Sequence, residues 1–184
     1  MLIALNKPYG YICQFSPHEK HRNLKELVSL PNVYPAGRLD TDSEGLLLLT
    51  DNGQQQARIA HPRFKLVKTY WAQLEGTPHP EQIAQLEQPM NLGDFIAQPA
   101  QTRLLMPAEV ARIWQRDPPV RYRKTVPDFW LEIRIAEGKN RQVRRMTAKA
   151  HYPCLRLVRT GIGRINLFDL DLPLGQWQPL TTLP

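Results

Sequence analysis

Residues 37–53 read GRLDTDSEGLLLLTDNG, a loop of charged residues that leads into four consecutive leucines. A short apolar run that ends at the turn signal Asp51-Asn52-Gly53 predicts a buried strand over 46–50. The loop before it carries Arg38 and three carboxylates, Asp40 among them. Polar side chains held in a loop beside a rigid strand are a common way to present a catalytic group. A surface turn fits the same residues, so spacing alone leaves both interpretations open.

A calcium site is a third interpretation of this loop. Asp40, Asp42 and Glu44 fall at positions 1, 3 and 5 of an EF-hand loop, and Asp51 falls at position 12. That motif needs a helix on each side and a bidentate glutamate at its twelfth position. Pro35 opposes a helix before the loop, and the predicted leucine strand opposes a helix after it. We therefore expect no metal here, and no phosphate-binding or dinucleotide-binding loop indicates a cofactor.

Length and composition indicate one ordinary globular domain. The chain has 184 residues, of which 42% are hydrophobic and 22% charged, which excludes a disordered or fibrous protein. No apolar run approaches the roughly 20 residues of a membrane span, and the N-terminus has no secretion signal. Cys13 and Cys154 are too few for a disulfide framework or a four-cysteine zinc site. They predict reduced thiols in a cytoplasmic protein.

The net charge of +7 is concentrated in one segment. Residues 138–168 contain no Asp or Glu but hold 8 of the 24 basic residues, so the remainder has 16 basic against 17 acidic side chains. A charge run is usually a solvated face. An entire positive excess confined to one segment nevertheless favours a polyanionic partner, and nucleic acid is the first candidate.

Part of this segment predicts an amphipathic helix over 140–151. At 100° per residue, its core-facing stripe is Val143, Met146, Thr147 and Ala150. On the opposite face we expect three cations that could meet phosphates: Arg141, Arg145 and Lys149. Arg144 falls at the border of the stripe. The wheel leaves open whether it is a snorkelling surface residue or a half-buried one that needs a carboxylate. If that carboxylate were an aspartate of the first loop, Arg144 would hold it ionised. An ionised, positioned carboxylate is a nucleophile or a general base.

The remaining elements predict an α+β fold with a mainly antiparallel sheet, because strands and helices do not alternate regularly. A capping box at Asn23 and Glu26 predicts a helix over 24–30, and Pro80 predicts the start of a helix that runs to about residue 88. Residues 107–127 are rich in arginine around Pro118-Pro119, and we expect a mobile loop or insertion. Further strands are expected over 2–5, 66–74, 102–106 and 129–135, with short strands after 151.

Five segments in order resemble the motifs of the RsuA-type ribosomal RNA pseudouridine synthases. They are NKPYG at 6–10, GRLD at 37–40 with its strand through Gly53, KTY at 68–70, EGKNRQVRRM at 137–146 and LVRTGIG at 157–163. Together they span most of the chain, and those at 37–53 and 137–146 are highly specific. Within the family, the sequence looks most similar to the RluE-type enzymes of large-subunit RNA.

The resemblance implies a role for each of five residues. Asp40 would be the catalytic aspartate, and Tyr70 would stack on the target uracil and help to move a proton. Arg144 would pair with Asp40. Leu157 would form an apolar floor beneath the base, and Arg38 would enter the RNA stack where the uridine has left. A base must leave its stack before an enzyme can act on it.

The resemblance also implies the organisation of the protein and its partners. Residues 1–184 would form a single catalytic domain of two lobes around a mixed, largely antiparallel sheet, with the site in the cleft between them. Most relatives carry an S4 RNA-binding domain ahead of this one, and no segment here corresponds to it. We expect a bacterial monomer without cofactor, acting on ribosomal RNA, 23S before 16S. The alternative is a catalytically silent RNA-binding or ribosome-assembly factor with the same fold.

Overall fold

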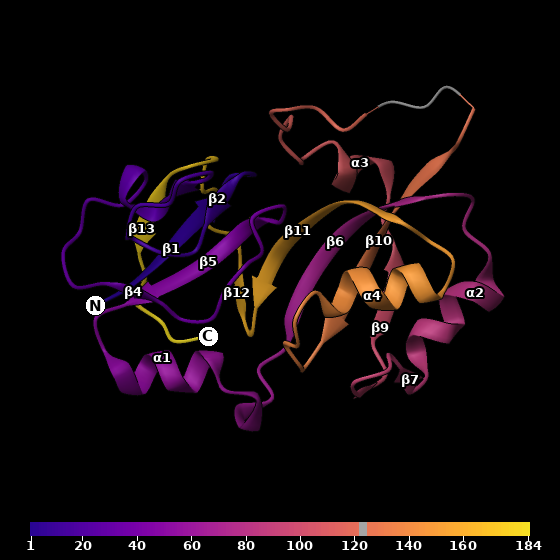
Figure 1. The fold of residues 1–184 in the computed structure, drawn as a ribbon, viewed down its shortest axis with the longest axis horizontal. Helices are drawn as coiled ribbons and strands as arrows, with labels where there is room; N and C mark the ends of the chain where they lie inside the picture. The colour runs from indigo at the N-terminus through magenta and orange to yellow at the C-terminus, as the bar shows by residue number, and fades with distance from the viewer. Residues whose placement is uncertain (122–124) are drawn as a thin grey trace. The chain divides into compact units, whose positions relative to one another are not determined.

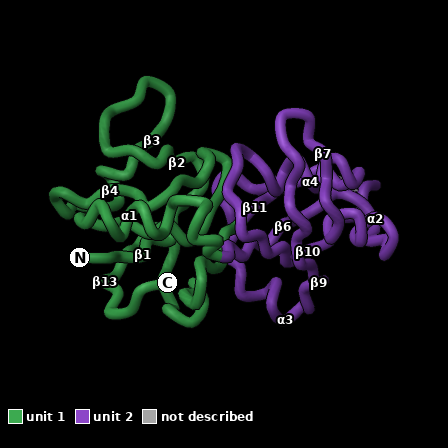
Figure 2. The backbone as a smooth tube through the Cα atoms, turned by 90° about the horizontal axis from the view of Figure 1, so that it is seen from below, with its two compact units in different colours: residues 1–66, 158–184 green, residues 67–157 purple. Residues whose placement is uncertain are grey.

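The computed structural model describes residues 1–121 and 125–184, and these fall into two units (Figures 1 and 2). Unit 1 consists of residues 1–66 and 158–184, and unit 2 of residues 67–157. Strand β11 (Cys154–Ile162) contributes its first residues to unit 2 and its last residues to unit 1. In the described residues, no helix is long and apolar enough to cross a lipid bilayer.

Unit 1 is built on four strands in the order β13-β1-β5-β11, with β4 beside β5 and β12 beside β11. Its elements are β1 (Leu2–Lys7), β2 (Tyr11–Ile12), β3 (Arg22–Asn23), η1 (Leu24–Glu26), β4 (Tyr34–Pro35), β5 (Glu44–Thr50), α1 (Gly53–Ala60), η2 (Pro62–Phe64), β12 (Ile165–Asn166) and β13 (Trp177–Pro179). Strand β5 is antiparallel to β1 and parallel to β11.

The leucine run forms the centre of unit 1, as the sequence predicts. Leu46, Leu47, Leu48 and Leu49 are each 0% exposed, so both faces of β5 are covered. A strand covered on both faces needs apolar residues at successive positions, because alternating side chains point to opposite faces. Helix α1 packs against this strand. The burial of β5 fixes the place at which the charged loop before it ends.

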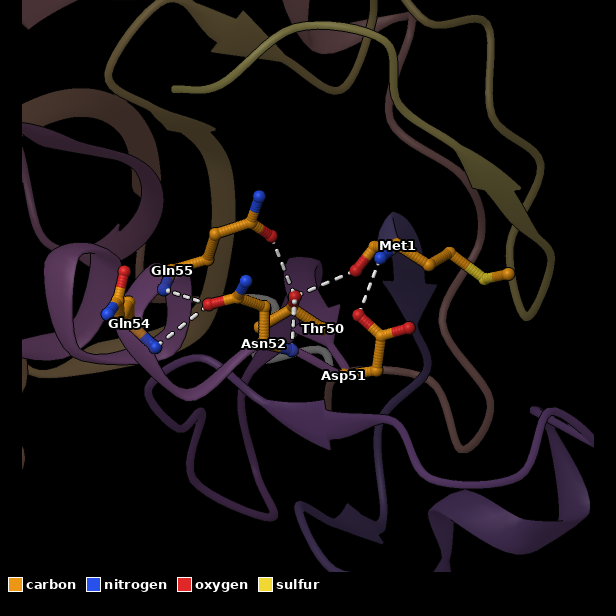
Figure 3. A network of polar contacts seen from close by, with 6 residues as sticks. All are labelled: Met1, Thr50, Asp51, Asn52, Gln54 and Gln55. Atoms are coloured by element: carbon orange, nitrogen blue, oxygen red, sulfur yellow. Dashed lines mark hydrogen bonds and ion pairs between the residues drawn. The ribbon is translucent and has the colours of Figure 1, made fainter.

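Helix α1 begins at Gly53 because the polar turn after β5 caps it (Figure 3). Asn52 Oδ1 accepts hydrogen bonds from the amides of Gln54 and Gln55, at 2.9 and 3.0 Å. The same turn holds the start of the chain, since the Met1 ammonium lies 2.5 Å from a carboxylate oxygen of Asp51. The two bonds to Asn52 satisfy helix N–H groups that have no partner within the helix itself.

Unit 2 is a sheet in the order β11-β6-β10-β9 with short helices around it (Figure 1). Its elements are β6 (Lys68–Glu75), α2 (Pro80–Ala84), η3 (Gln85–Glu87), β7 (Met90–Asn91), β8 (Ile96–Ala97), β9 (Gln101–Leu104), α3 (Pro107–Val110), β10 (Asp128–Ile135) and α4 (Gln142–Lys149). Strand β10 is antiparallel to both β6 and β9. The α+β class with a mainly antiparallel sheet is therefore confirmed.

Several predicted elements have different bounds in the structure. The capping box of Asn23 and Glu26 is present, but it begins a single 3-10 turn over Leu24–Glu26 and not a helix to residue 30. Helix α4 is shorter than 140–151, since Arg141 adopts a left-handed φ of 48° immediately before it.

Two longer segments also differ from expectation. Residues 107–127 are not loop throughout, because Pro107–Val110 forms α3, where the Glu109 carboxylate accepts the Met106 amide at 2.8 Å. Residues 122–124 of that segment lie outside the described residues. Strand β11 is nine residues long, where only short strands were expected.

Candidate active site

The loop that carries Asp40, residues 36–43, is fastened by its backbone. The amide of Gly10 donates to the carbonyl of Thr41 at 2.8 Å, and the amide of Ser43 donates to the carbonyl of Asp40 at 3.1 Å. Cys13 contacts Leu39 twice: its sulfur accepts the Leu39 amide and its thiol donates to the Leu39 carbonyl, each at 3.3 Å. This Asp40 loop is therefore held at the residues on either side of the carboxylate.

Arg159 holds the same loop from β11. Its side chain is buried at 4% exposure, Nε donates to the carbonyl of Leu46 at 2.8 Å, and Nη1 donates to the carbonyl of Arg38 at 3.3 Å. The two carbonyls lie before and after the Asp40 loop's acidic residues. The sequence placed Arg159 in a motif but gave no sign of this function, because its partner Arg38 is 121 residues away.

A buried lysine forms hydrogen bonds with the backbone of the turn after β1. Lys7 is 0% exposed, and its Nζ donates to the carbonyls of Pro8 and Tyr11, at 3.0 and 2.8 Å. Burial lowers the pKa of Lys7 from 10.5 to about 8, since a low-dielectric environment disfavours the ammonium. Lys7 thereby fixes the turn whose Gly10 amide binds the Asp40 loop.

Asp40 and Arg38 differ in exposure within this loop. Asp40 is half-buried, between buried Leu39 and half-buried Thr41, and Arg38 is exposed. A carboxylate on a fixed backbone and partly removed from water can act as a nucleophile or as a base. An exposed arginine beside it has the reach and the charge to contact a nucleic acid.

In unit 2, Tyr70 and Leu157 are both nearly buried. Tyr70 lies in β6 opposite Ile133 of β10 and is 9% exposed, and Leu157 in β11 is 5% exposed. The amide of Glu75 donates to the carbonyl of Pro153 at 2.9 Å, which joins the end of β6 to the segment before β11. Both residues are thus set in the sheet.

Helix α4 has the burial pattern that the helical wheel predicts. Val143, Met146, Thr147 and Ala150 are buried, while Arg144 is half-buried at their border. The Arg144 guanidinium donates from Nη1 to the carbonyl of Cys154 at 3.1 Å. It therefore lies beside the start of β11, the strand that carries Leu157 three residues later.

The three cations expected on the outer face of α4 have different environments. Arg141 is exposed immediately before the helix. Arg145 keeps 32% of its side chain exposed, but it also forms an ion pair with Asp94 and donates to the carbonyl of Leu92 at 2.6 Å, which the sequence analysis did not anticipate. Lys149 is exposed, and its ammonium donates to the carbonyl of Asn91 at 2.5 Å. Asp94 lies 51 residues before Arg145 in the sequence, so no local pattern could reveal the pair.

Among residues 1–121 and 125–184, no three His, Cys, Asp or Glu side chains come close enough to hold a metal ion. The EF-hand interpretation is opposed by the secondary structure, since Glu44 is buried as the first residue of β5. In the described part of the chain β4 and not a helix precedes residues 40–51, most of that stretch is β5 itself, and α1 begins only at Gly53. The acidic loop is therefore not organised as that type of calcium site.

Comparison with known proteins assigns the chain to a family. Residues 1–149 match the family model described as RNA pseudouridylate synthase, a region that includes Asp40, Tyr70 and Arg144. The chain belongs to the RNA pseudouridylate synthase family. Its members are RNA-modifying isomerases, so the family predicted from five sequence segments and the predicted enzyme class are both confirmed.

Named relatives of this pseudouridine synthase include two ribosomal enzymes. It is 53% identical over 184 residues to ribosomal large subunit pseudouridine synthase E of Xanthomonas axonopodis pv. citri, which covers 99% of this chain and 95% of that protein. It is 36% identical over 185 residues to ribosomal small subunit pseudouridine synthase A of Yersinia pestis, which covers 98% of this chain and 69% of that protein.

A solved structure confirms the fold. A crystal structure of a pseudouridylate synthase superposes with a TM-score of 0.78 at 29% identity, over 98% of this chain and 70% of that one. The pseudouridine synthase fold expected from the sequence is therefore present.

Proposed function

We propose that this pseudouridine synthase converts a uridine of large-subunit ribosomal RNA to pseudouridine, with Asp40 as the catalytic carboxylate. The observation that carries the proposal is the fixed and half-buried position of Asp40 in a loop bound by Gly10, Cys13 and Arg159. The choice of large-subunit RNA rests on similarity. The relative named for the large subunit is 53% identical, against 36% for the one named for the small subunit.

The reaction needs only acid–base or nucleophilic chemistry, which a carboxylate can supply. The C1′–N1 bond of uridine breaks, the uracil turns, and C5 joins C1′. The hydrogen at C5 leaves as a proton and N1 gains one, so no electrons and no external group are exchanged. Asp40 would act in one of three ways: by attack at C1′, by addition to the uracil ring, or by removal of the ribose 2′ proton.

The other four site residues have supporting roles in this proposal. Tyr70 and Leu157 would bind the two faces of the uracil, since an aromatic ring stacks on a base and a leucine offers an apolar surface. Arg144 would pair with Asp40 and keep it ionised. Arg38, exposed beside Asp40, would fill the space that the flipped uridine leaves in the RNA.

The cations around α4 would bind phosphates. Arg141 is exposed. Lys149 uses one of the three N–H donors of its ammonium on Asn91, which leaves two for RNA. Arg145 is held by Asp94 and would act on RNA less directly. Because these contacts go to the backbone of the RNA, they would supply affinity and not sequence specificity.

Tritium release tests the reaction and the choice of RNA together. Large-subunit and small-subunit RNA are transcribed with tritium at uracil C5, and release to water is counted with purified protein. We expect release that saturates near one tritium per large-subunit RNA and no release from small-subunit RNA. Release from small-subunit RNA alone would refute the substrate choice. Binding to both without release would indicate a silent RNA-binding factor.

A further inference from the structure

The buried guanidinium of Arg159 spans the Asp40 loop. Its two hydrogen bonds go to backbone carbonyls, of Arg38 two residues before Asp40 and of Leu46 six residues after it. One planar group therefore ties Arg38 of the loop to Leu46 of β5, the strand that follows the loop. A guanidinium suits this function because its donors are fixed in one plane and point in different directions.

A second observation fixes Arg159 to the same place through the backbone. Gly45 and Arg159 are register partners where β5 and β11 run in parallel. A Cβ atom at Gly45 would lie 2.3 Å from the carbonyl oxygen of Arg159, and Gly45 adopts a φ of +99°. The two strands thus approach each other more closely than any side chain permits. The first residues of β5, directly after the Asp40 loop, and the backbone of Arg159 therefore hold one another in position.

The hydrogen bonds of Arg159 leave part of its capacity unused. Its Nη2 atom is buried and has no hydrogen-bond partner within residues 1–121 and 125–184. A burial that leaves a charged donor unsatisfied is unfavourable for stability. An apolar side chain would fill this place without that cost, so stability alone does not account for an arginine here.

We propose that Arg159 is a positioning residue for the pseudouridine synthase reaction, which sets the place of the Asp40 carboxylate through the backbone of its loop. The proposal rests on the function proposed above. Arg159 acts through Arg38 and Leu46 and not by contact with the RNA. Small displacements of a reacting group lower rates strongly: about 1 Å can lower the rate by roughly 100-fold.

The test compares Arg159→Met and Arg159→Lys with a control that destabilises the same unit elsewhere. The control is Ile3→Ala, because Ile3 is buried and pairs with Leu49 at the far end of β5. Single-turnover tritium release, RNA affinity and Tm are measured for each variant. For Arg159→Met we expect a rate constant about 100-fold lower with affinity little changed. Arg159→Lys should recover part of the rate, since one ammonium can replace only some of the hydrogen bonds that the guanidinium makes.

Hydrogen exchange gives a readout that needs no activity. In Arg159→Met, amides of residues 38–46 should exchange faster than in wild type, while in Ile3→Ala they should change no more than the rest of unit 1. The positioning role is wrong if Arg159→Met and Ile3→Ala show equal exchange in this segment, or equal rates at equal loss of Tm. A wild type without tritium release would refute the proposed function, and exchange would still decide the role of Arg159.

Discussion

The side chain of Cys13 forms two hydrogen bonds with the backbone of Leu39. The sulfur accepts the Leu39 amide and the thiol donates to the Leu39 carbonyl, both at 3.3 Å. Leu39 itself is 7% exposed and directly precedes Asp40. A small side chain 26 residues away thus satisfies both polar groups of the peptide units next to the candidate catalytic carboxylate.

We expect Cys13→Ala to weaken this arrangement. It leaves two nearly buried backbone groups without a partner, which typically costs about 1–3 kcal/mol each when buried fully. The free energy of unfolding in urea should fall by roughly 1–3 kcal/mol, and tritium release should slow. Cys154→Ala serves as the control, because that thiol is in unit 2 and donates to the carbonyl of Arg156. Equal effects of the two substitutions on tritium release would contradict the role of Cys13.

Gly45→Ala is predicted to be strongly destabilising. The new Cβ would lie 2.3 Å from the Arg159 carbonyl oxygen, and a φ of +99° is unfavourable for alanine. A loss of at least about 2 kcal/mol in the free energy of unfolding is expected. Gly53→Ala is the matched control, since a Cβ there meets no atom within 4 Å at the first residue of α1. That variant should be neutral or slightly stabilising. Similar unfolding curves for the two would show that the strands do not approach as described.

The buried Lys7 predicts a specific dependence of stability on pH. Below pH 8 the lysine is charged in both folded and unfolded chains, and the unfavourable burial of the charge is fully present. Between pH 8 and pH 10.5 the folded protein releases a proton that the unfolded chain retains. The free energy of unfolding should therefore rise with pH over that range, by about 3 kcal/mol in total.

Lys7→Met isolates this contribution. Other groups titrate in the same range, so the quantity to measure is the difference between wild type and variant in urea unfolding from pH 7 to pH 10. The variant should lack the rise that wild type shows. Parallel curves for the two proteins would mean that Lys7 retains an ordinary pKa, despite its burial and its bonds to Pro8 and Tyr11.

RNA binding should depend on salt through the cations near α4. Arg141→Ala should reduce affinity for large-subunit RNA and lower the slope of log Kd against log salt by roughly 0.7–0.9, the effect of one lost phosphate contact. Arg58→Ala is the control, because Arg58 is also an exposed arginine but lies on α1. An unchanged slope for Arg141→Ala would remove this helix terminus from the RNA interface.

Local patterns in the sequence predicted the elements that local forces decide. The four leucines gave a strand buried on both faces, and the stripe of α4 was correct at all four positions. The capping box at Asn23 was also correct, although the helix it begins is one turn long. Such features depend on neighbours within one or two turns of chain, and periodicity reports them.

The contacts that hold Asp40 could not be predicted in this way. Cys13 reaches Leu39 over 26 residues, and Arg159 reaches Arg38 over 121. No spacing rule connects such pairs, because the fold brings them together. The glycine before the leucines carried the one indication, since an isolated glycine at a strand marks a close approach of another backbone. The pairing of Arg144 with Asp40 stays a prediction of the resemblance.

The catalytic role of Asp40 is tested most directly by one pair of substitutions in one loop. Asp40→Asn and Asp42→Asn each remove one negative charge from neighbouring half-buried positions. Single-turnover tritium release from large-subunit RNA, with RNA affinity measured alongside, separates chemistry from binding. We predict no release with Asp40→Asn, affinity within a few-fold of wild type, and retained release with Asp42→Asn. Turnover by Asp40→Asn near the wild-type rate would contradict the central claim.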